Sequence, residues 1–456
     1  MRAGNRQTVV FEGIAEKPVV VQFNRPDESS DGGAILLKAV DNRLALTARM
    51  AASVRDRRQA GKVDHPMVDL IRERVFAIAC GYPDCNDAAK LRTDPVMKLA
   101  CGHSPVEAAD LASQPTLSRF ENALSRTDLL RMAYAMTDSV IASQAKLRHG
   151  VRTITLDMDP TEDPTYGGQQ MTFFNAFYDN WCYLPMVTTI QFDKETEQWL
   201  VAPLLRPGNA KGSLGAIGIL QRLLPRLKKA FPKARLRVRM DGAFATPEVL
   251  SWLEGQHLDY AINMPINPVL KRLAEPWMKQ VRPQAEHSGR TEGIFAETPD
   301  YKAGTWPYPR RIVIKAEVVA LEGKPLRDNA RFVVTNMKRS PRALYRFYAS
   351  RGDAENRLKE LHYGLAFDRT SCTAFSANQL RNLLTAAAYT IYQHLRLSAK
   401  NTDCEHAQVS TLRERLIKIG VAVVESVRRI VFRAPLAFPW LVTWRRLALA
   451  LSLPSG

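Results

Sequence analysis

The chain has 456 residues, and its 64 Lys and Arg against 46 Asp and Glu give a net charge of +18. This length allows two to four domains with a sizeable core. Hydrophobic residues at 46% and charged residues at 24% exclude a disordered chain or a fibre. Six cysteines exclude a disulfide scaffold, and the strong positive charge favours a polyanionic partner.

No stretch of the sequence has the pattern of a targeting or membrane segment. The first 13 residues lack the apolar centre of a signal peptide. The most apolar stretch, residues 438–453, is interrupted by Arg445 and Arg446. We therefore expect a bacterial protein that is cytoplasmic, associated with the nucleoid, and without a membrane partner.

The first 150 residues show two patterns. Residues 1–35 alternate weakly and predict an N-terminal arm of short strands and loops. Apolar residues at spacings of three and four predict a helical region over residues 36–150. Within it, residues 109–126 are typical of a helix, a short turn and a second helix, which suits either a DNA-binding helix-turn-helix or plain bundle packing.

Near Arg152 the apolar period shortens from about 3.6 to about 2 residues, and the pattern becomes that of an α/β core. Three segments predict a meander of strands, namely residues 151–159, 171–180 and 183–193. A helix, a strand, a helix and a strand are then predicted over residues 212–231, 235–242, 247–256 and 258–266. This alternation predicts a layered α/β domain that begins with residues 151–266.

The remaining residues complete this core and add two further parts. Residues 267–330 are irregular and strand-like, with frequent Pro and Gly, and we interpret them as a β-rich insertion. Residues 331–400 resume the core with a buried strand, a helix that contains Glu355, and a long amphipathic helix. Residues 401–456 form a basic C-terminal region with a predicted hairpin.

Three carboxylates occupy positions that suit a cation site. Asp159 and Asp241 each end a predicted core strand, where acids point into the ligand-binding crevice of an α/β sheet. Glu355 lies in a later helix, with Arg351 and Lys359 one turn away on the same face. Converging carboxylates suit Mg²⁺ or Mn²⁺, and a base beside them can hold a phosphate. Each acid alone fits a turn or a solvated helix face equally well.

Four sequence blocks carry a resemblance to a known family. They read LASQPTLSRFENALSR (111–126), LDMDPTEDPTYGGQQ (156–170), RMDGAF (239–244) and YASRGDAENRLKE (348–360). In this order they resemble the DDE transposases of bacterial insertion sequences, in the group with LDxDxTxDPTxG, DGxF and YxxRGDxENRxKE blocks. The resemblance implies an RNase H-like core, a mixed sheet flanked by helices, with a β-rich insertion and a preceding α-helical DNA-binding region.

The resemblance also implies a catalytic site. It makes Asp159, Asp241 and Glu355 the catalytic acids, which would hold two Mg²⁺ or Mn²⁺ ions. Asp157 is the alternative for the first acid, because strand alternation places it on the same face as Asp159. We prefer Asp159 because Asp159-Pro160-Thr161 is similar to the Asp-x-Thr of the family's LDxDxTxDPTxG block.

Further residues are implied to contact DNA. Tyr348 and Arg351 match the family signature Tyr-x-x-Arg-x-x-x-Glu. The Lys that usually follows the Glu by seven residues is replaced by His362, so Lys359 is a second candidate for that phosphate contact. In the first block, the candidates for contacts to bases or phosphates of the transposon ends are Thr116, Ser118 and Arg119.

These features predict an enzyme that binds terminal inverted repeats in double-stranded DNA and carries out Mg²⁺-dependent strand cleavage and strand transfer into target DNA. Because one active site processes one end at a time, we expect a homodimer on paired ends. No nucleotide cofactor is expected, since no phosphate-binding loop is present. Two alternatives stay open, a catalytically inactive DNA-binding regulator and an RNase H-like nuclease that hydrolyses DNA without joining it.

Three other groups of residues have competing interpretations. Cys80, Cys85, Cys101 and His103 are zinc-ligand types, but their irregular spacing favours buried cysteines. In the insertion, Trp277 and Trp306 can stack on an unpaired base or pack in a hydrophobic core, and packing is favoured. Residues 198–240 contain no acid. The Lys and Arg side chains among them predict a surface that contacts the DNA backbone, unless these side chains face away from the DNA.

Overall fold

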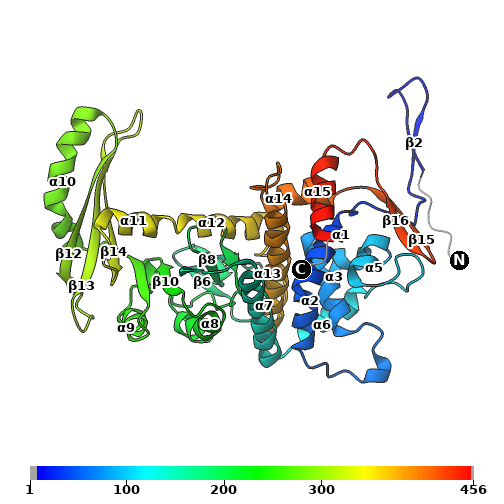
Figure 1. Ribbon diagram of the computed structural model, residues 1–456, viewed down its shortest axis with the longest axis horizontal. Helices are drawn as coiled ribbons and strands as arrows, with labels where there is room; N and C mark the ends of the chain where they lie inside the picture. The colour runs from blue at the N-terminus through cyan, green and yellow to red at the C-terminus, as the bar shows by residue number, and fades with distance from the viewer. Residues whose placement is uncertain (1–7, 453–456) are drawn as a thin grey trace. The chain divides into compact units, whose positions relative to one another are not determined.

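The computed structural model describes residues 8–452, which form two compact units (Figure 1). The terminal unit contains the chain up to Arg43, then Asp56–Phe120, and the chain from His394 onwards. The sheet unit contains Leu44–Arg55 and Glu121–Gln393. Residues of the first 150 positions therefore contribute to both units. No helix within residues 8–452 has the length and apolar character needed to cross a membrane.

The terminal unit combines helices from the start of the chain with a hairpin from its end. Its larger helices are α1 (Ala34–Leu44), α3 (Met67–Ala79), α4 (Cys85–Lys90), α5 (Pro95–Cys101), α6 (Gln114–Ala123) and α15 (Leu441–Ser452), with a short α14 (Val409–Leu412). Strands β1 (Thr8–Phe11) and β2 (Val19–Gln22) pair antiparallel. A second sheet has the order β16-β15-β3, from Arg429–Arg433, Val421–Ser426 and Glu28–Ser29. The predicted C-terminal hairpin is confirmed by β15 and β16.

Chain segments far apart in the sequence lie in close contact in the terminal unit. Lys418 Nζ lies 2.6 Å from the buried Asp31 carboxylate. At Gly33 a Cβ atom would lie 1.8 Å from the carbonyl oxygen of Leu416, so only glycine fits there. The C-terminal region is therefore packed against the first helices of its own unit.

The sheet unit is built on one eight-stranded mixed sheet of order β12-β13-β14-β11-β10-β4-β8-β9. The strands are β4 (Thr153–Pro160), β8 (Met186–Phe192), β9 (Trp199–Leu200), β10 (Arg235–Met240), β11 (Asp259–Met264), β12 (Glu292–Tyr301), β13 (Arg310–Val319) and β14 (Arg327–Thr335). Strands β4, β10 and β11 are parallel, and their neighbours on both sides are antiparallel. This arrangement confirms the predicted fold class.

Helices flank this sheet. They are α7 (Arg126–Leu147), α8 (Ala216–Ala230), α9 (Pro247–Gly255), α11 (Pro341–Ala349), α12 (Gly352–Lys359) and α13 (Phe375–Ser398). A shorter helix, α2 (Leu46–Ala52), packs against α7. In α8, Leu220, Leu223 and Leu227 are buried at helical spacing and hold the helix on the sheet, while Lys228 and Lys229 stay exposed. In Figure 1, α11 and α12 run end to end across the sheet unit.

The predicted meander is wrong in its middle strand. Residues 171–180 do not enter the large sheet, because β4 pairs directly with β8. Instead β6 (Phe173–Asn175) and β7 (Asn180–Tyr183) form a small separate sheet with β5 (Asp163–Pro164). Phe174 and Trp181 there stay about half exposed, so the apolar residues do not mark a buried strand.

The prediction of an irregular, strand-like segment is also wrong at the start of the insertion. Residues Pro268–Ser288 form the long helix α10, which contains Pro276 and Pro283. Its buried side chains include Val281 and Ala285, which cluster with Val318 of β13. The strands that follow are β-rich as expected, and β14 pairs with β11, so the insertion extends the large sheet.

The predicted helix-turn-helix at residues 109–126 is not formed as expected. Residues 108–113 are not helical, and a single helix, α6, occupies most of the segment. The next helix, α7, begins after Ser125, whose side chain accepts a hydrogen bond from the Asp128 backbone in a capping box. The serine at position 125 therefore marks the start of α7, a boundary that the spacing of apolar residues alone does not reveal.

Candidate active site

Two of the three predicted acids lie next to each other at one edge of the large sheet. Met158 of β4 and Met240 of β10 are partners in the parallel ladder, so Asp159 and Asp241 follow at the same level. Neighbouring strands in a sheet lie about 4.8 Å apart. Asp241 also accepts a 2.9 Å hydrogen bond from the backbone of Ala243, which fixes the turn after β10.

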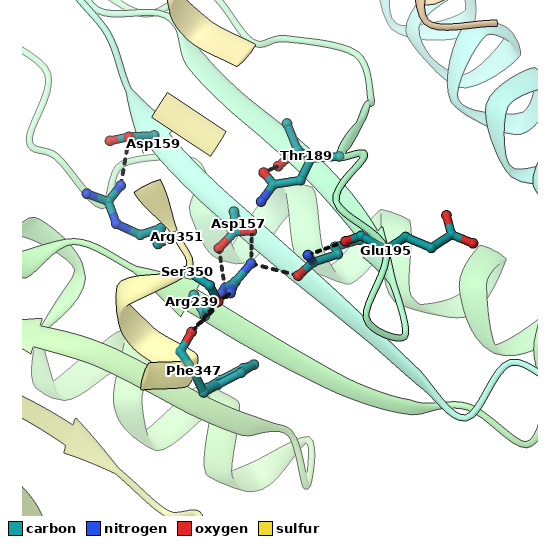
Figure 2. A network of polar contacts seen from close by, with 10 residues as sticks. Asp157, Asp159, Thr189, Glu195, Arg239, Phe347, Ser350 and Arg351 are labelled. Carbon is teal, nitrogen blue, oxygen red and sulfur yellow. Dashed lines mark hydrogen bonds and ion pairs between the residues drawn. The ribbon is translucent and has the colours of Figure 1, made fainter. Parts of the chain in front are cut away.

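The third acid reaches this edge from helix α12. Arg351, at the start of that helix, donates a hydrogen bond of 2.7 Å to Asp159 Oδ2 and another of 2.7 Å to Glu355 Oε1. Figure 2 shows the first of these contacts. One guanidinium group therefore links the strand acid to the helix acid, and residues from three separate segments meet at one place.

The charges of Asp241 and Glu355 affect the pKa of Asp159. Burial raises the pKa of Asp159 to about 6, the charges of Asp241 and Glu355 add to this rise, and Arg351 opposes it. Burial also raises the pKa of Asp241, against the effects of the Ala243 backbone and Arg351. The site therefore concentrates negative charge in a poorly solvated place, where an added cation would be favourable.

Asp157 has a different environment. Its carboxylate is buried, with 2% of the side chain exposed, and it accepts two hydrogen bonds from Arg239, of 2.8 and 2.6 Å. It lies within the sheet rather than at its edge, as Figure 2 shows. This geometry favours Asp159 as the first acid of the site.

The other DNA-contact candidates in and after the 348–360 block have distinct surroundings. The Tyr348 ring lies 6.3 Å from that of Tyr345. His362 Nε2 lies 3.0 Å from the Thr161 hydroxyl, so His362, two residues after the 348–360 block, contacts the 156–170 block. Lys359 is exposed on α12, at the end of the helix that carries Glu355. Of the two candidates for a phosphate contact, the geometry favours Lys359.

The residues of the LASQPTLSRF block belong to the terminal unit, whereas the three acids belong to the sheet unit. All three DNA-contact candidates lie on α6, where Arg119 Nη2 lies 3.4 Å from Thr116 Oγ1. Thr116 Oγ1 is also 3.1 Å from Ser113 Oγ. Ser118 lies on the same helix.

The acid-free stretch of residues 198–240 is not one basic surface, and the structure corrects that prediction. Arg206 and Arg239 are buried. Arg206 donates to the carbonyl oxygens of Leu184, Lys211, Gly212 and Leu214, and so holds the loop before α8. Strand alternation does not reveal the burial of Arg239, because both faces of this central strand are covered.

A metal ion fits the chemistry of the three acids. Their donor atoms are carboxylate oxygens only, which suit hard divalent cations. Over residues 8–452, no three His, Cys, Asp or Glu side chains are arranged to hold a metal ion as they stand. At the acids, Arg351 supplies the positive charge instead.

Burial explains part of the cysteine and tryptophan candidates, whereas Cys85 is only partly buried and Trp277 is 37% exposed. Cys80 and Cys101 are buried, and burial raises the pKa of both thiols. His103 is 2.8 Å from Asp69. Trp306 is 3% exposed and packs edge-on against Tyr301, so hydrophobic packing is the correct interpretation for this residue.

Comparison with known proteins identifies the family. The model of the transposase DDE domain group 1 matches residues 11–453. Among solved structures, the cryo-EM structure of the piggyBac transposase synaptic complex with hairpin DNA is similar to this chain, with a TM-score of 0.41 and 11% identity. The similarity covers 99% of this chain and 85% of that one. No curated protein matches. Because the family match spans almost the whole sequence, the chain belongs to the transposases with a group 1 DDE domain, and it is a DNA transposase, an enzyme of the polynucleotidyl transferase type.

Proposed function

We propose that this transposase acts for a bacterial insertion sequence, binds its terminal inverted repeats, and catalyses metal-dependent strand cleavage and strand transfer. One observation carries the proposal. Acids from β4, the end of β10 and helix α12 meet at one sheet edge, where Arg351 joins Asp159 to Glu355. Segments so far apart in the chain are brought together by the fold itself.

The three acids would hold two Mg²⁺ or Mn²⁺ ions. When bound, such ions generate the attacking oxygen nucleophile and stabilise the leaving oxygen in phosphodiester exchange. Arg351 neutralises part of the charge of Asp159 and Glu355. Once cations take over that role, its planar guanidinium group is available to bind a DNA phosphate.

The chemistry requires two successive reactions at this site. In the first, water attacks a phosphodiester bond at the transposon end and releases a 3′-hydroxyl. In the second, that hydroxyl attacks a target phosphate, so that one phosphodiester bond replaces another. The exchange conserves the number of phosphodiester bonds and needs no nucleotide cofactor.

DNA would be bound by basic residues of both units. On the sheet unit, Lys228, Lys229 and Lys233 are exposed, and Lys359 lies on the helix of Glu355. On the terminal unit, Thr116, Ser118 and Arg119 of α6 would contact the transposon ends. Two ends need two active sites at a fixed spacing, so a homodimer on paired ends is the assembly we propose.

A cleavage assay tests the proposal. The full-length protein is incubated with a labelled duplex that carries the inverted repeat found beside the gene, with Mg²⁺, with Mn²⁺, or with a chelator. We expect one cut at the repeat end with either ion and none with the chelator. Cutting that is unaffected by the chelator would contradict the metal-dependent mechanism, and uncut but bound DNA would indicate a regulator.

A further inference from the structure

We propose that Arg239 is a positioning residue, which fixes helix α12 and thereby holds Glu355 and Arg351 against the strand that carries Asp159. The functional part of this inference rests on the proposed role of those acids. The structural part rests only on contacts within the sheet unit. Figure 2 shows the network that carries it.

On the sheet side, Arg239 joins three neighbouring strands. It lies on β10 with 1% of its side chain exposed, and its partner in the parallel ladder is Asp157 of β4. Nε and Nη2 donate to the two oxygens of Asp157, at 2.8 and 2.6 Å. Nη2 also donates to Gln191 Oε1 of β8, at 2.9 Å. The guanidinium group is therefore fixed in its plane by β4 and β8.

On the helix side, the same group holds the junction between α11 and α12. Nη1 donates to the carbonyl oxygen of Phe347 at 3.0 Å and to the hydroxyl of Ser350. Ser350 in turn donates to the Phe347 carbonyl at 2.8 Å. The next residue is Arg351, which bonds Asp159. The start of α12 is thus attached to the sheet immediately before the residues that reach the acids.

All the donors of Arg239 have partners. A guanidinium group has five N–H donors, and Arg239 makes five hydrogen bonds, to Asp157 twice, Gln191, Phe347 and Ser350. A lysine has three donors on one nitrogen and no fork, so it cannot join strand and helix in this way. The arrangement therefore needs arginine.

Stability alone is a weak reason for such a pair. Burying two charges costs about as much as their attraction returns, and apolar replacements of both are often neutral or stabilising. The ladder position gives another reason. Asp157 and Arg239 each precede an acid of the site by two residues, Asp159 and Asp241 respectively. The network therefore sets the distance between α12 and the strand ends that carry these two acids.

The test replaces both charges, so that neither is left buried alone. In full-length Asp157→Leu/Arg239→Met, the sheet keeps apolar contacts, but the attachment to Phe347 and Ser350 is lost. We expect hydrogen–deuterium exchange of the amides of residues 352–359 to become about tenfold faster, without metal or DNA. Mn²⁺ affinity, measured by electron paramagnetic resonance, should fall about tenfold, as it does when the support of metal ligands is removed.

A control uses another buried arginine of the same sheet, together with its carboxylate partner. Arg310 of β13 is 3% exposed at its side chain, and it bonds Glu254 of α9, whose side chain is 21% exposed. Glu254→Leu/Arg310→Met should leave exchange at 352–359 and Mn²⁺ affinity unchanged. If the first double variant does not fold, Ser350→Ala, which removes one contact, should give a smaller change in the same direction.

The outcomes separate the positioning role from the proposed function. Unchanged exchange at residues 352–359 in the folded double variant, or in Ser350→Ala, overturns the positioning role. Faster exchange with unaltered Mn²⁺ affinity overturns its link to the site. Absence of Mn²⁺ binding by the wild-type protein contradicts the proposed function instead, while the exchange result still decides whether Arg239 positions α12.

Discussion

Arg351 donates a 2.7 Å hydrogen bond to Asp159, which places a positive charge from helix α12 against the acid at the end of β4. The same guanidinium group reaches Glu355. The protein therefore carries its own counter-charge at the site, in the form of a side chain that can also bind phosphate. Binding of metal and release of Arg351 are expected to be coupled, since both neutralise the same carboxylates.

The pH dependence of stability should report the environment of Asp159. Its pKa is raised from 3.8 to about 6 in the folded protein. Between these values the folded state binds the proton more strongly than the unfolded state, so stability falls as pH rises through this window and stays level above it. Asp159→Asn should remove this loss. Relative to wild type, we expect its free energy of unfolding to be about 2–3 kcal/mol higher at pH 7 and unchanged near pH 4.

Thermal unfolding of both proteins across pH 4–8 measures this difference. Asp300→Asn is the control, because Asp300 is exposed on β12. It should shift the unfolding temperature equally at every pH. If the unfolding temperatures of wild type and Asp159→Asn depended on pH in the same way, the pKa of Asp159 would not be raised in the folded protein.

Metal affinity should also depend on the protonation of Asp159, but it should rise with pH where the stability falls. A cation binds the deprotonated carboxylate, so Mn²⁺ affinity should rise with pH up to about 6 and then level off. Isothermal titration between pH 5 and 8 gives the curve. An affinity that keeps rising steeply above pH 7 would point to a ligand other than Asp159.

Loss of a single carboxylate charge should abolish cleavage and spare DNA binding. Asp241→Asn and Glu355→Gln keep the shape of the side chains and the basic surface, so we expect cleavage to fall by about 10³-fold or more. End binding, measured by fluorescence anisotropy, should change by less than about twofold. Asp353→Asn, on the same helix as Glu355, serves as the control. Near-normal cutting by either acid variant would remove that residue from the site.

DNA binding should weaken steeply with salt. Contact with six phosphates gives a slope of about −5 in a plot of log affinity against log salt concentration. Charge reversal of the exposed lysines Lys228, Lys229 and Lys233 should make the slope shallower by about 2–3, because each substitution removes a phosphate contact. Equal flattening by reversal of Lys17 and Lys62 would mean that α8 is not the main contact.

End recognition should depend on α6. In the full-length protein, Arg119→Ala should reduce the preference for the terminal repeat over random DNA by about tenfold. The intact chain is needed because residues 1–150 are divided between the two units. Lys90→Ala on α4 is the control. A full preference retained by Arg119→Ala, read by nuclease protection, would place recognition elsewhere.

The sequence is most informative where periodicity and motif agree. Alternation along 153–160 and 235–240 predicts β4 and β10, and the position of Asp159 and Asp241 after these strands predicts that both point into one crevice. The spacing of Arg351 and Lys359, four residues on either side of Glu355, likewise suits the helix that the structure shows there. These signals are local, so a single sequence contains them.

Other features depend on contacts that no local pattern records. Pro276 and Pro283 favour breaks, yet α10 continues through both because its apolar side chains are anchored on β13. Arg239 has the pattern of a surface base, because alternation cannot show that helices and strands cover both faces of β10. The partner of Arg239 in the ladder, Asp157, lies 82 residues earlier in the chain.

Joining of DNA strands is the activity that separates a transposase from a nuclease or a regulator. A labelled duplex with a pre-cut transposon end and a free 3′-hydroxyl is incubated with the full-length protein, Mg²⁺ and a supercoiled plasmid, without nucleotide cofactor. We expect the labelled strand to become covalently attached to the plasmid, and Glu355→Gln to abolish this product. Plasmid that is nicked but never labelled would contradict strand transfer and show a nuclease, and bound but unaltered DNA would show a regulator.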